Sequence, residues 1–218
     1  MSKMPAIVRL RRRELVLGAA AALLSPPVLA ADGARRVVTP GQTEGPFYPA
    51  AYPPDMDNDL VRVQGRAADS LGQVTHIAGR VLDKRGAPVR GATVEIWQCD
   101  ANGIYNHPRQ AGLQSRDTAF QGYGRTEVTA DGGYSFRTIR PVAYPGRTPH
   151  IHFKVNAPGV GRLTTQMYVA GEPGNARDGV LNAIPNAAQR SSVIVRLDHA
   201  GATAPGALLG VFDIVLDI

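Results

Sequence analysis

This chain of 218 residues contains a single cysteine, Cys99. A lone cysteine rules out an intramolecular disulfide and the Cys-rich ligand sets of structural zinc sites. Because Cys99 follows the strand-like run Glu95-Ile96-Trp97-Gln98, we expect a small buried side chain rather than a nucleophile. Packing must therefore stabilise the core, and a bound metal could add to that stability.

Long apolar runs and basic patches are also missing. No stretch is long and apolar enough to span a membrane in the mature protein. The net charge of +6 is concentrated in residues 1–30, where five basic side chains oppose Glu14 and give +4, which leaves +2 for the remainder. That remainder has no basic stripe with interleaved aromatic residues, so we expect no nucleic-acid partner. The five basic residues are Lys3, Arg9, Arg11, Arg12 and Arg13.

The first 30 residues have the layout of an export signal. Three arginines at 11–13 precede a moderately apolar stretch at 15–24, and small residues end the segment near Ala30. This order is typical of a cleaved signal peptide. The paired arginines resemble a twin-arginine signal, although Leu10 stands where Ser or Thr is usual. We therefore expect residues 1–30 to direct export, and the mature protein to be periplasmic or secreted.

The remaining chain divides into two parts. Residues 31–75 are rich in Pro, Asp and Gly, and we expect them to wrap a surface without a core of their own. Residues 76–218 alternate apolar and polar side chains in short runs between Gly- and Pro-rich turns. This pattern predicts an all-β protein, an antiparallel β-sandwich with long loops that carry function. The expected strands are 76–82, 92–98, 134–137, 150–156, 162–169, 192–197 and 210–217, with a short helical turn near 178–189.

His150 and His152 are two residues apart in a predicted strand. Because side chains alternate along a strand, both imidazoles project from one face and could offer nitrogen atoms to one metal ion. Tyr144 lies between two prolines six residues before His150, and Tyr105 follows the strand that contains Trp97. The alternative is a solvated strand whose two histidines share a face by chance.

Two phenols and two imidazoles favour a ferric ion, because hard phenolate oxygen suits it better than zinc or Cu(I). Non-haem ferrous oxygenases use two His and one carboxylate, and no Asp or Glu has a compelling spacing from the His pair. The residues alone leave three interpretations open. The chain could be an iron enzyme, a β-sandwich binding module without chemistry, or a protein that binds zinc or copper for its structure.

Several short motifs occur together between about residue 40 and the C-terminus. They are Gly79-Arg80-Val81-Leu82-Asp83, Val94-Glu95-Ile96-Trp97-Gln98, Gly103-Ile104-Tyr105, the Asp-Gly-Gly-Tyr-Ser-Phe-Arg-Thr-Ile-Arg-Pro run at 131–141, Tyr144-Pro145, Pro149-His150-Ile151-His152-Phe153 and Thr165-Gln166-Met167-Tyr168. In combination they resemble the intradiol ring-cleavage dioxygenases, and the similarity is closest to the protocatechuate 3,4-dioxygenase branch.

The resemblance implies an enzyme with one ferric ion, Fe(III). It also implies that a catechol-type substrate displaces Tyr144, which takes up a proton as it leaves. Arg147 matches a residue that stabilises charge on the substrate, and Gln166 matches a pocket residue. The implied reaction uses O2 to cleave the ring between the two hydroxyl-bearing carbons and gives a muconate-type diacid. The metal ligands carried over are Tyr105, Tyr144, His150 and His152.

The chain departs from the family pattern near the site. The stretch between Tyr144 and His150 is short and Gly146 replaces a tryptophan, so we expect a more open pocket. The helical dimerisation region of catechol 1,2-dioxygenases is missing, and a homo-oligomer remains possible. His107 is either an additional acid or base or an exposed loop histidine, and Tyr48 either lines the pocket or packs. Which catechol is the substrate stays open.

Overall fold

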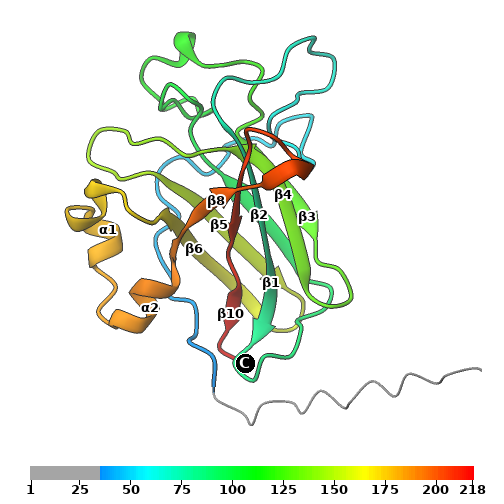
Figure 1. Cartoon of the computed structure of the whole chain (residues 1–218), viewed down its shortest axis with the longest axis vertical. Helices are drawn as coiled ribbons and strands as arrows, with labels where there is room; N and C mark the ends of the chain where they lie inside the picture. Colours follow the sequence, from blue (N-terminus) through cyan, green and yellow to red (C-terminus); the bar gives the residue numbers. More distant parts are fainter. Residues whose placement is uncertain (1–34) are drawn as a thin grey trace, which may run out of the picture. The chain divides into compact units, whose positions relative to one another are not determined.

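Residues 35–218 are described by the structure, which is a computed structural model, and the expected export signal at 1–30 lies outside them. This part of the chain forms ten strands and five short helices (Figure 1). None of these helices has the length and apolar character needed to cross a membrane. The strands are β1 Val74–Asp83, β2 Thr93–Trp97, β3 Tyr123–Glu127, β4 Gly133–Ile139, β5 His150–Ala157, β6 Gly161–Val169, β7 Ile194–Val195, β8 Leu197–His199, β9 Leu208–Val211 and β10 Ile214–Leu216. The helices are η1 Leu113–Ser115, η2 Pro173–Ala176, α1 Gly179–Asn182, α2 Ala187–Ser192 and η3 Gly201–Thr203.

The strands form two five-stranded sheets. In the first sheet β10, β1, β9 and β8 follow one another and β4 also pairs with β1, whereas the second sheet has the order β3-β2-β5-β6-β7. The prediction of an all-β sandwich is confirmed, but its sheets are mixed, because β1 runs parallel to β9 and β10, and β6 parallel to β7. Parallel neighbours need a long crossover, and residues 170–193, which contain both α-helices, supply it between β6 and β7.

The core lies between the sheets and uses alternate residues of each strand. In β5, Ile151, Phe153 and Val155 are completely buried in it, and the side chains between them lie on the opposite face. Phe153 meets Phe212, which lies between β9 and β10, with 5.1 Å between the ring centroids. Burial of each large apolar side chain contributes about 1.5–3 kcal/mol, so the face of β5 that packs in the core stabilises the fold.

The strand predicted at 210–217 is interrupted in the structure. It divides into β9 and β10 at Phe212, whose N–H donates to the carbonyl of Ala78 and whose carbonyl accepts from the hydroxyl of Tyr134. A Cβ at position 79 would lie 1.9 Å from that carbonyl oxygen, so only Gly79 allows this close approach. The strand predicted at 192–197 is also divided, into β7 and β8.

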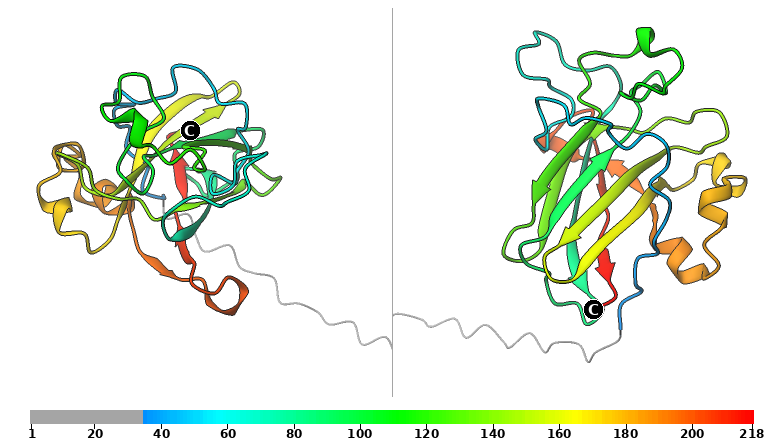
Figure 2. Two further views of the ribbon diagram at one scale, coloured as in Figure 1. Left: turned by 90° about the horizontal axis from the view of Figure 1, so that it is seen from above. Right: turned by 180° about the vertical axis from the view of Figure 1, so that it is seen from behind.

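The N-terminal segment, residues 35–73, contains no helix or strand and runs along the second sheet (Figure 2). The N–H of Gln42 donates to the carbonyl of Thr164 in β6, and the N–H of Leu60 donates to the carbonyl of Arg137 in β4, at 2.8 Å in each case. The segment therefore contacts both sheets, and it begins beside β10 of the first sheet, where the N–H of Thr39 donates to the carbonyl of Val215 at 2.9 Å. It covers the side of the sandwich where β3 and β4 form the edges.

Candidate metal centre

The loops that follow β2 and β4 lie at the end of the sandwich opposite the C-terminus (Figure 1). Tyr105 comes from the first loop, Tyr144 from the second, and His150 and His152 from the start of β5. The ring centroids are 5.6 Å apart for Tyr105–Tyr144, 5.4 Å for Tyr144–His150, 4.9 Å for His150–His152 and 6.1 Å for Tyr105–His152. The structure therefore brings all four candidate ligands together, and we call this group the ring cluster.

One hydrogen bond decides which nitrogen of His150 is free. Its Nδ1 lies 2.6 Å from the carbonyl oxygen of Thr148, and because a carbonyl can only accept, Nδ1 carries the proton. Nε2 keeps its lone pair and lies 3.3 Å from the hydroxyl of Tyr144. Burial lowers the pKa of His150 to about 4, and the positive charge of Arg147 adds to this effect. His150 is therefore neutral at pH 7, and the lone pair of Nε2 can bind a cation.

His152 is positioned by stacking. Its ring lies on the indole of Trp97, with the centroids 4.7 Å apart and an angle of 11° between the planes. Trp97 is the residue paired with His152 across β2 and β5, so the sheet register fixes this contact. Burial lowers the pKa of His152 well below its ordinary value, so this imidazole is neutral too. Its buried Nδ1 has no hydrogen-bond partner among the described residues.

Both phenols of the ring cluster are protonated in the protein alone. Burial raises the pKa of Tyr105 well above its ordinary value, and it raises the pKa of Tyr144 as well. The buried hydroxyl of Tyr105 lies near the hydroxyl of Tyr144 but makes no hydrogen bond of good geometry within residues 35–218. A buried polar group left in this way costs about 1–3 kcal/mol. A highly charged cation would remove that penalty, because coordination deprotonates the phenol and satisfies its oxygen.

The ring cluster fits a hard trivalent cation such as Fe(III). It offers two neutral imidazoles and two phenols, a set that suits ferric iron better than zinc or Cu(I). Within the described part of the chain, no group of three or more His, Cys, Asp or Glu side chains could hold a metal. A metal centre there would depend on phenol ligands. The residues placed to hold the ion are Tyr105, Tyr144, His150 and His152.

Arg147 and Gln166 contact each other beside the ring cluster. Arg147 Nη2 donates to Gln166 Oε1 at 2.5 Å, and Arg147 Nε donates to Asp178 Oδ2 at 2.8 Å. Gln166 is fully buried, and its side-chain nitrogen Nε2 donates to the carbonyl of Thr43 in the N-terminal segment. The guanidinium is thus held at two points. Its charge opposes the effect of burial on the pKa of Tyr144.

Residues 43–48 of the N-terminal segment cover the ring cluster. Phe47 stacks on Tyr105 with centroids 4.7 Å apart and an angle of 20° between the rings. Gly45 has a φ of 73°, and a Cβ there would lie 3.5 Å from Cε1 of His152, so the backbone itself closes this side. Exclusion of water strengthens every electrostatic interaction inside the site.

Two residues whose roles the sequence left open lie next to the ring cluster and outside it. Tyr48 donates to the buried carboxylate of Glu95 at 2.7 Å, and Nζ of Lys154 lies 3.4 Å from the centroid of its ring. Tyr48 therefore packs over the sheet. His107 is buried and not exposed as its loop position suggested, and its Nδ1 accepts from the N–H of Arg109 at 3.1 Å.

Asp178 is the site residue that the sequence did not reveal. Its buried carboxylate binds Arg147, which lies 31 residues away along the chain. The available signal is the position of Asp178 directly before α1, where Asp is a favoured N-cap. That signal predicts a capped helix and says nothing of Arg147, because a pair at this separation depends on the tertiary fold.

Comparison with known proteins places the chain among dioxygenases. A family model described as Dioxygenase matches residues 43–218. The protocatechuate 3,4-dioxygenase beta chain of Burkholderia cepacia is 40% identical over 180 residues, which cover 78% of this chain and 76% of that protein. The chain spans about half the length of the catechol and hydroxyquinol 1,2-dioxygenases it matches.

Solved structures share the fold. The dioxygenase domain of a dioxygenase carbohydrate-binding protein fusion from the cellulolytic bacterium Streptomyces sp. SirexAA-E has a TM-score of 0.64 and 34% identity, with 84% of this chain and 99% of that chain covered. Catechol 1,2-dioxygenase from Acinetobacter sp. ADP1 has a TM-score of 0.64 and 28% identity, with 82% and 62% covered.

Proposed function

The chain belongs to the family of intradiol ring-cleavage dioxygenases, and from this premise we propose that it uses non-haem Fe(III) and O2 to cleave a catechol-type ring. Cleavage falls between the two hydroxyl-bearing carbons, and the product is a muconate-type diacid that contains both atoms of O2. The proposed iron ligands are Tyr105, Tyr144, His150 and His152. Tyr144, Arg147 and Gln166 are the proposed catalytic residues.

The observation that carries this proposal is the meeting of two phenols and two imidazoles from three separate segments in one cluster, in which Tyr105, His150 and His152 are buried and Tyr144 is half-buried. A sandwich that served only structure would gain by filling this space with apolar side chains, because the unpartnered hydroxyl of Tyr105 lowers stability. Local arrangements that cost stability are expected at functional sites.

Iron bound to the ring cluster would supply a Lewis acid that makes the substrate ring reactive toward O2. Burial favours the protonated form of Tyr144, so its Oη is suited to hold the proton that a substrate hydroxyl gives up. Arg147, held by Gln166, places positive charge near Tyr144, where it would stabilise charge on a bound substrate. Such electrostatic help is worth about 3–4 kcal/mol. Gly45 and Phe47 keep water away from the reacting groups.

Product analysis with labelled oxygen tests the proposal. Iron-loaded protein is incubated with catechol, protocatechuate or hydroxyquinol under 18O2, and the products are identified by mass spectrometry. We expect a diacid that carries label from both atoms of O2. Cleavage outside the hydroxyl pair would contradict the proposal. Tight binding of the diols without any product would favour a non-catalytic binding module.

We further propose that residues 1–30 direct export and that the mature enzyme works in the periplasm or outside the cell. The support is the order of basic, apolar and small residues in that segment. Expression of the full chain with Arg11 and Arg12 replaced by Lys tests the route. Retention of the variant in the cytoplasm is expected. An uncleaved wild-type chain in the cytoplasm would contradict the proposal.

A further inference from the structure

The two carboxylate oxygens of Asp178, a side chain with no solvent exposure, have different partners. Oδ1 accepts from the N–H groups of Val180 and Leu181, at 3.0 and 2.9 Å, and so caps α1. Oδ2 accepts from Nε of Arg147 at 2.8 Å and from the N–H of Thr148 at 3.0 Å. One oxygen serves the helix, and the other serves the loop before β5.

The contacts of Oδ2 reach two parts of the site. Arg147 is the guanidinium beside Tyr144 and Gln166. Thr148 donates its N–H to Asp178 and accepts the Nδ1 proton of His150 at its carbonyl. Asp178 thus fixes the backbone that orients His150, as well as the guanidinium. Loss of Oδ2 would release both at once.

Capping of α1 does not by itself require a carboxylate. Asn186, a neutral residue, caps α2 by accepting from the N–H of Gln189 at 3.1 Å. Asn and Ser are as effective as Asp at this position of a helix. A buried carboxylate is costly unless it is paired, so the charge of Asp178 is explained by Arg147 and not by the helix.

We propose that Asp178 is the positioning residue of this site: Oδ2 orients Arg147 toward the substrate and, through Thr148, orients His150 toward the metal. Oδ1 holds α1 and has no part in this. The inference rests on the proposed function, since the orientation of these groups matters for turnover only if a catechol is cleaved there.

Asp178→Asn and Asp178→Ser separate the two oxygens. Asn keeps a carbonyl oxygen for the cap and turns an NH2 group toward Arg147, and Ser keeps a hydroxyl for the cap and leaves the place of Oδ2 empty. In the iron-loaded enzyme we expect kcat to fall by about 10- to 100-fold in both variants, with a change in KM below about threefold. The Ser variant carries the test if the Asn variant fails to fold.

Asn186→Ala is the matched control, because it removes a helix cap of the same kind away from the site. It should lower Tm and leave kcat unchanged. A second readout needs no metal: the exchange rate of the Arg147 Nε–H, followed by NMR in the metal-free protein. We expect exchange to be at least about tenfold faster in both Asp178 variants than in wild type or in the control, because the buried hydrogen bond is lost.

Wild-type kcat and wild-type Nε–H exchange in both Asp178 variants would overturn the inference and leave the proposed function in place. A lowered Tm with unchanged kcat, as in Asn186→Ala, would assign Asp178 to the helix alone and would overturn it too. If wild-type protein turns over no catechol, the proposed function fails. The exchange rates of the metal-free protein then still decide whether Asp178 holds Arg147.

Discussion

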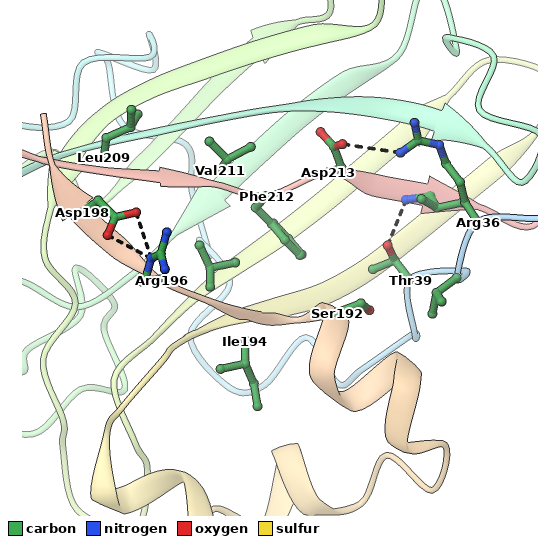
Figure 3. Close-up of a pocket in the computed structure, with 13 residues that line it drawn as sticks. Arg36, Thr39, Ser192, Ile194, Arg196, Asp198, Leu209, Val211, Phe212 and Asp213 are labelled. Atoms are coloured by element: carbon green, nitrogen blue, oxygen red, sulfur yellow. Dashed lines mark hydrogen bonds and ion pairs between the residues drawn. The ribbon is translucent and has the colours of Figure 1, made fainter. Parts of the chain in front are cut away.

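The outer faces of the two sheets are of opposite kinds. On the second sheet the N-terminal segment covers the outer face, and His152 beneath it is only 2% exposed. On the first sheet Leu209 and Val211 of β9 are 38% and 63% exposed. They lie along a surface groove of about 590 Å³ (Figure 3). The outer face of the second sheet is covered and buries polar rings, whereas the outer face of the first sheet is open and exposes apolar side chains to solvent.

The ion pairs differ in the same way. In the groove, Arg196 and Asp198 form a pair whose side chains are 80% and 58% exposed (Figure 3). Exposed pairs contribute about 0–1 kcal/mol. Arg147 and Asp178 are 16% and 0% exposed, and loss of one partner from such a buried pair costs about 3–5 kcal/mol. The functional face is therefore the outer face of the second sheet, which buries polar side chains, and not the face that carries the groove.

Removal of one phenol from the covered face should have the largest effect on activity, without a loss of stability. Tyr105→Phe deletes the buried, unpartnered hydroxyl, and we expect kcat/KM to fall at least about 100-fold because a proposed ligand is lost. The free energy of unfolding of the metal-free protein should rise by about 1–3 kcal/mol, because the substitution removes a buried hydroxyl that has no hydrogen bond of good geometry. Steady-state kinetics and urea denaturation measure the two effects.

Tyr134→Phe is the matched control for this prediction. Its hydroxyl donates to the carbonyl of Phe212 in the core, remote from the ring cluster. The variant should lose about 1–2 kcal/mol of stability and keep its activity. Retained turnover in Tyr105→Phe would contradict the role given to that phenol.

Acid should lower the free energy of unfolding of the metal-free protein, because His150 is buried on the covered face. The pKa of His150 is about 4 in the folded state, against about 6.5 in the unfolded chain. Between these values the unfolded chain binds more protons, so the free energy of unfolding falls as the pH drops from 6.5 to 4. The contribution of His150 is about 3 kcal/mol. Urea denaturation across this pH range should show the loss, and His150→Gln should reduce it; an identical pH dependence in that variant would contradict the assignment.

A smaller effect is expected when the cover over the second sheet is loosened. Gln42 accepts from the N–H of Gln166 at 3.0 Å and donates to the hydroxyl of Tyr168 at 2.8 Å. Gln42→Ala should cost about 1–3 kcal/mol, because it leaves buried groups unpaired, and should raise KM. Gln73→Ala is the control, since the side chain of Gln73 makes one exposed hydrogen bond, to the carbonyl of Gly206 at 3.2 Å. Equal losses in the two variants would contradict a special role for the cover.

The smallest effect should come from the open face. Val211→Thr keeps a β-branched side chain on β9 and should change the free energy of unfolding by no more than about 0.5 kcal/mol. Turnover should be unchanged. A fall in kcat/KM in this variant would show that the open face takes part in function, and the contrast between the two faces would then be lost.

Local patterns in the sequence predicted the face of the site and most of the strands. The spacing of His150 and His152 placed both rings on one face of β5, where the structure has them with centroids 4.9 Å apart. β3 was missed, because Tyr123-Gly-Arg-Thr-Glu127 has no apolar alternation and is a strand through its pairing with β2. Pairing of that kind depends on the partner and leaves little trace in the segment itself.

Contacts between distant segments account for the rest. Asp178 and Arg147 meet only because the crossover between β6 and β7 returns beside the loop before β5. His107 is buried because Phe47, from the N-terminal segment, packs against it with centroids 5.7 Å apart. The parallel pairing of β1 with β9 and β10 likewise joins the first strand of the sequence to the last two. Neither periodicity nor turn composition encodes such contacts.

The visible absorption spectrum of the mature protein, with iron quantified, tests the central claim most directly. It is recorded before and after addition of catechol without oxygen. A tyrosinate-to-Fe(III) band that shifts on catechol binding, and that is lost in Tyr105→Phe, is the predicted result. A protein that remains colourless after reconstitution with iron would contradict the metal centre and would favour a sandwich module that binds without chemistry.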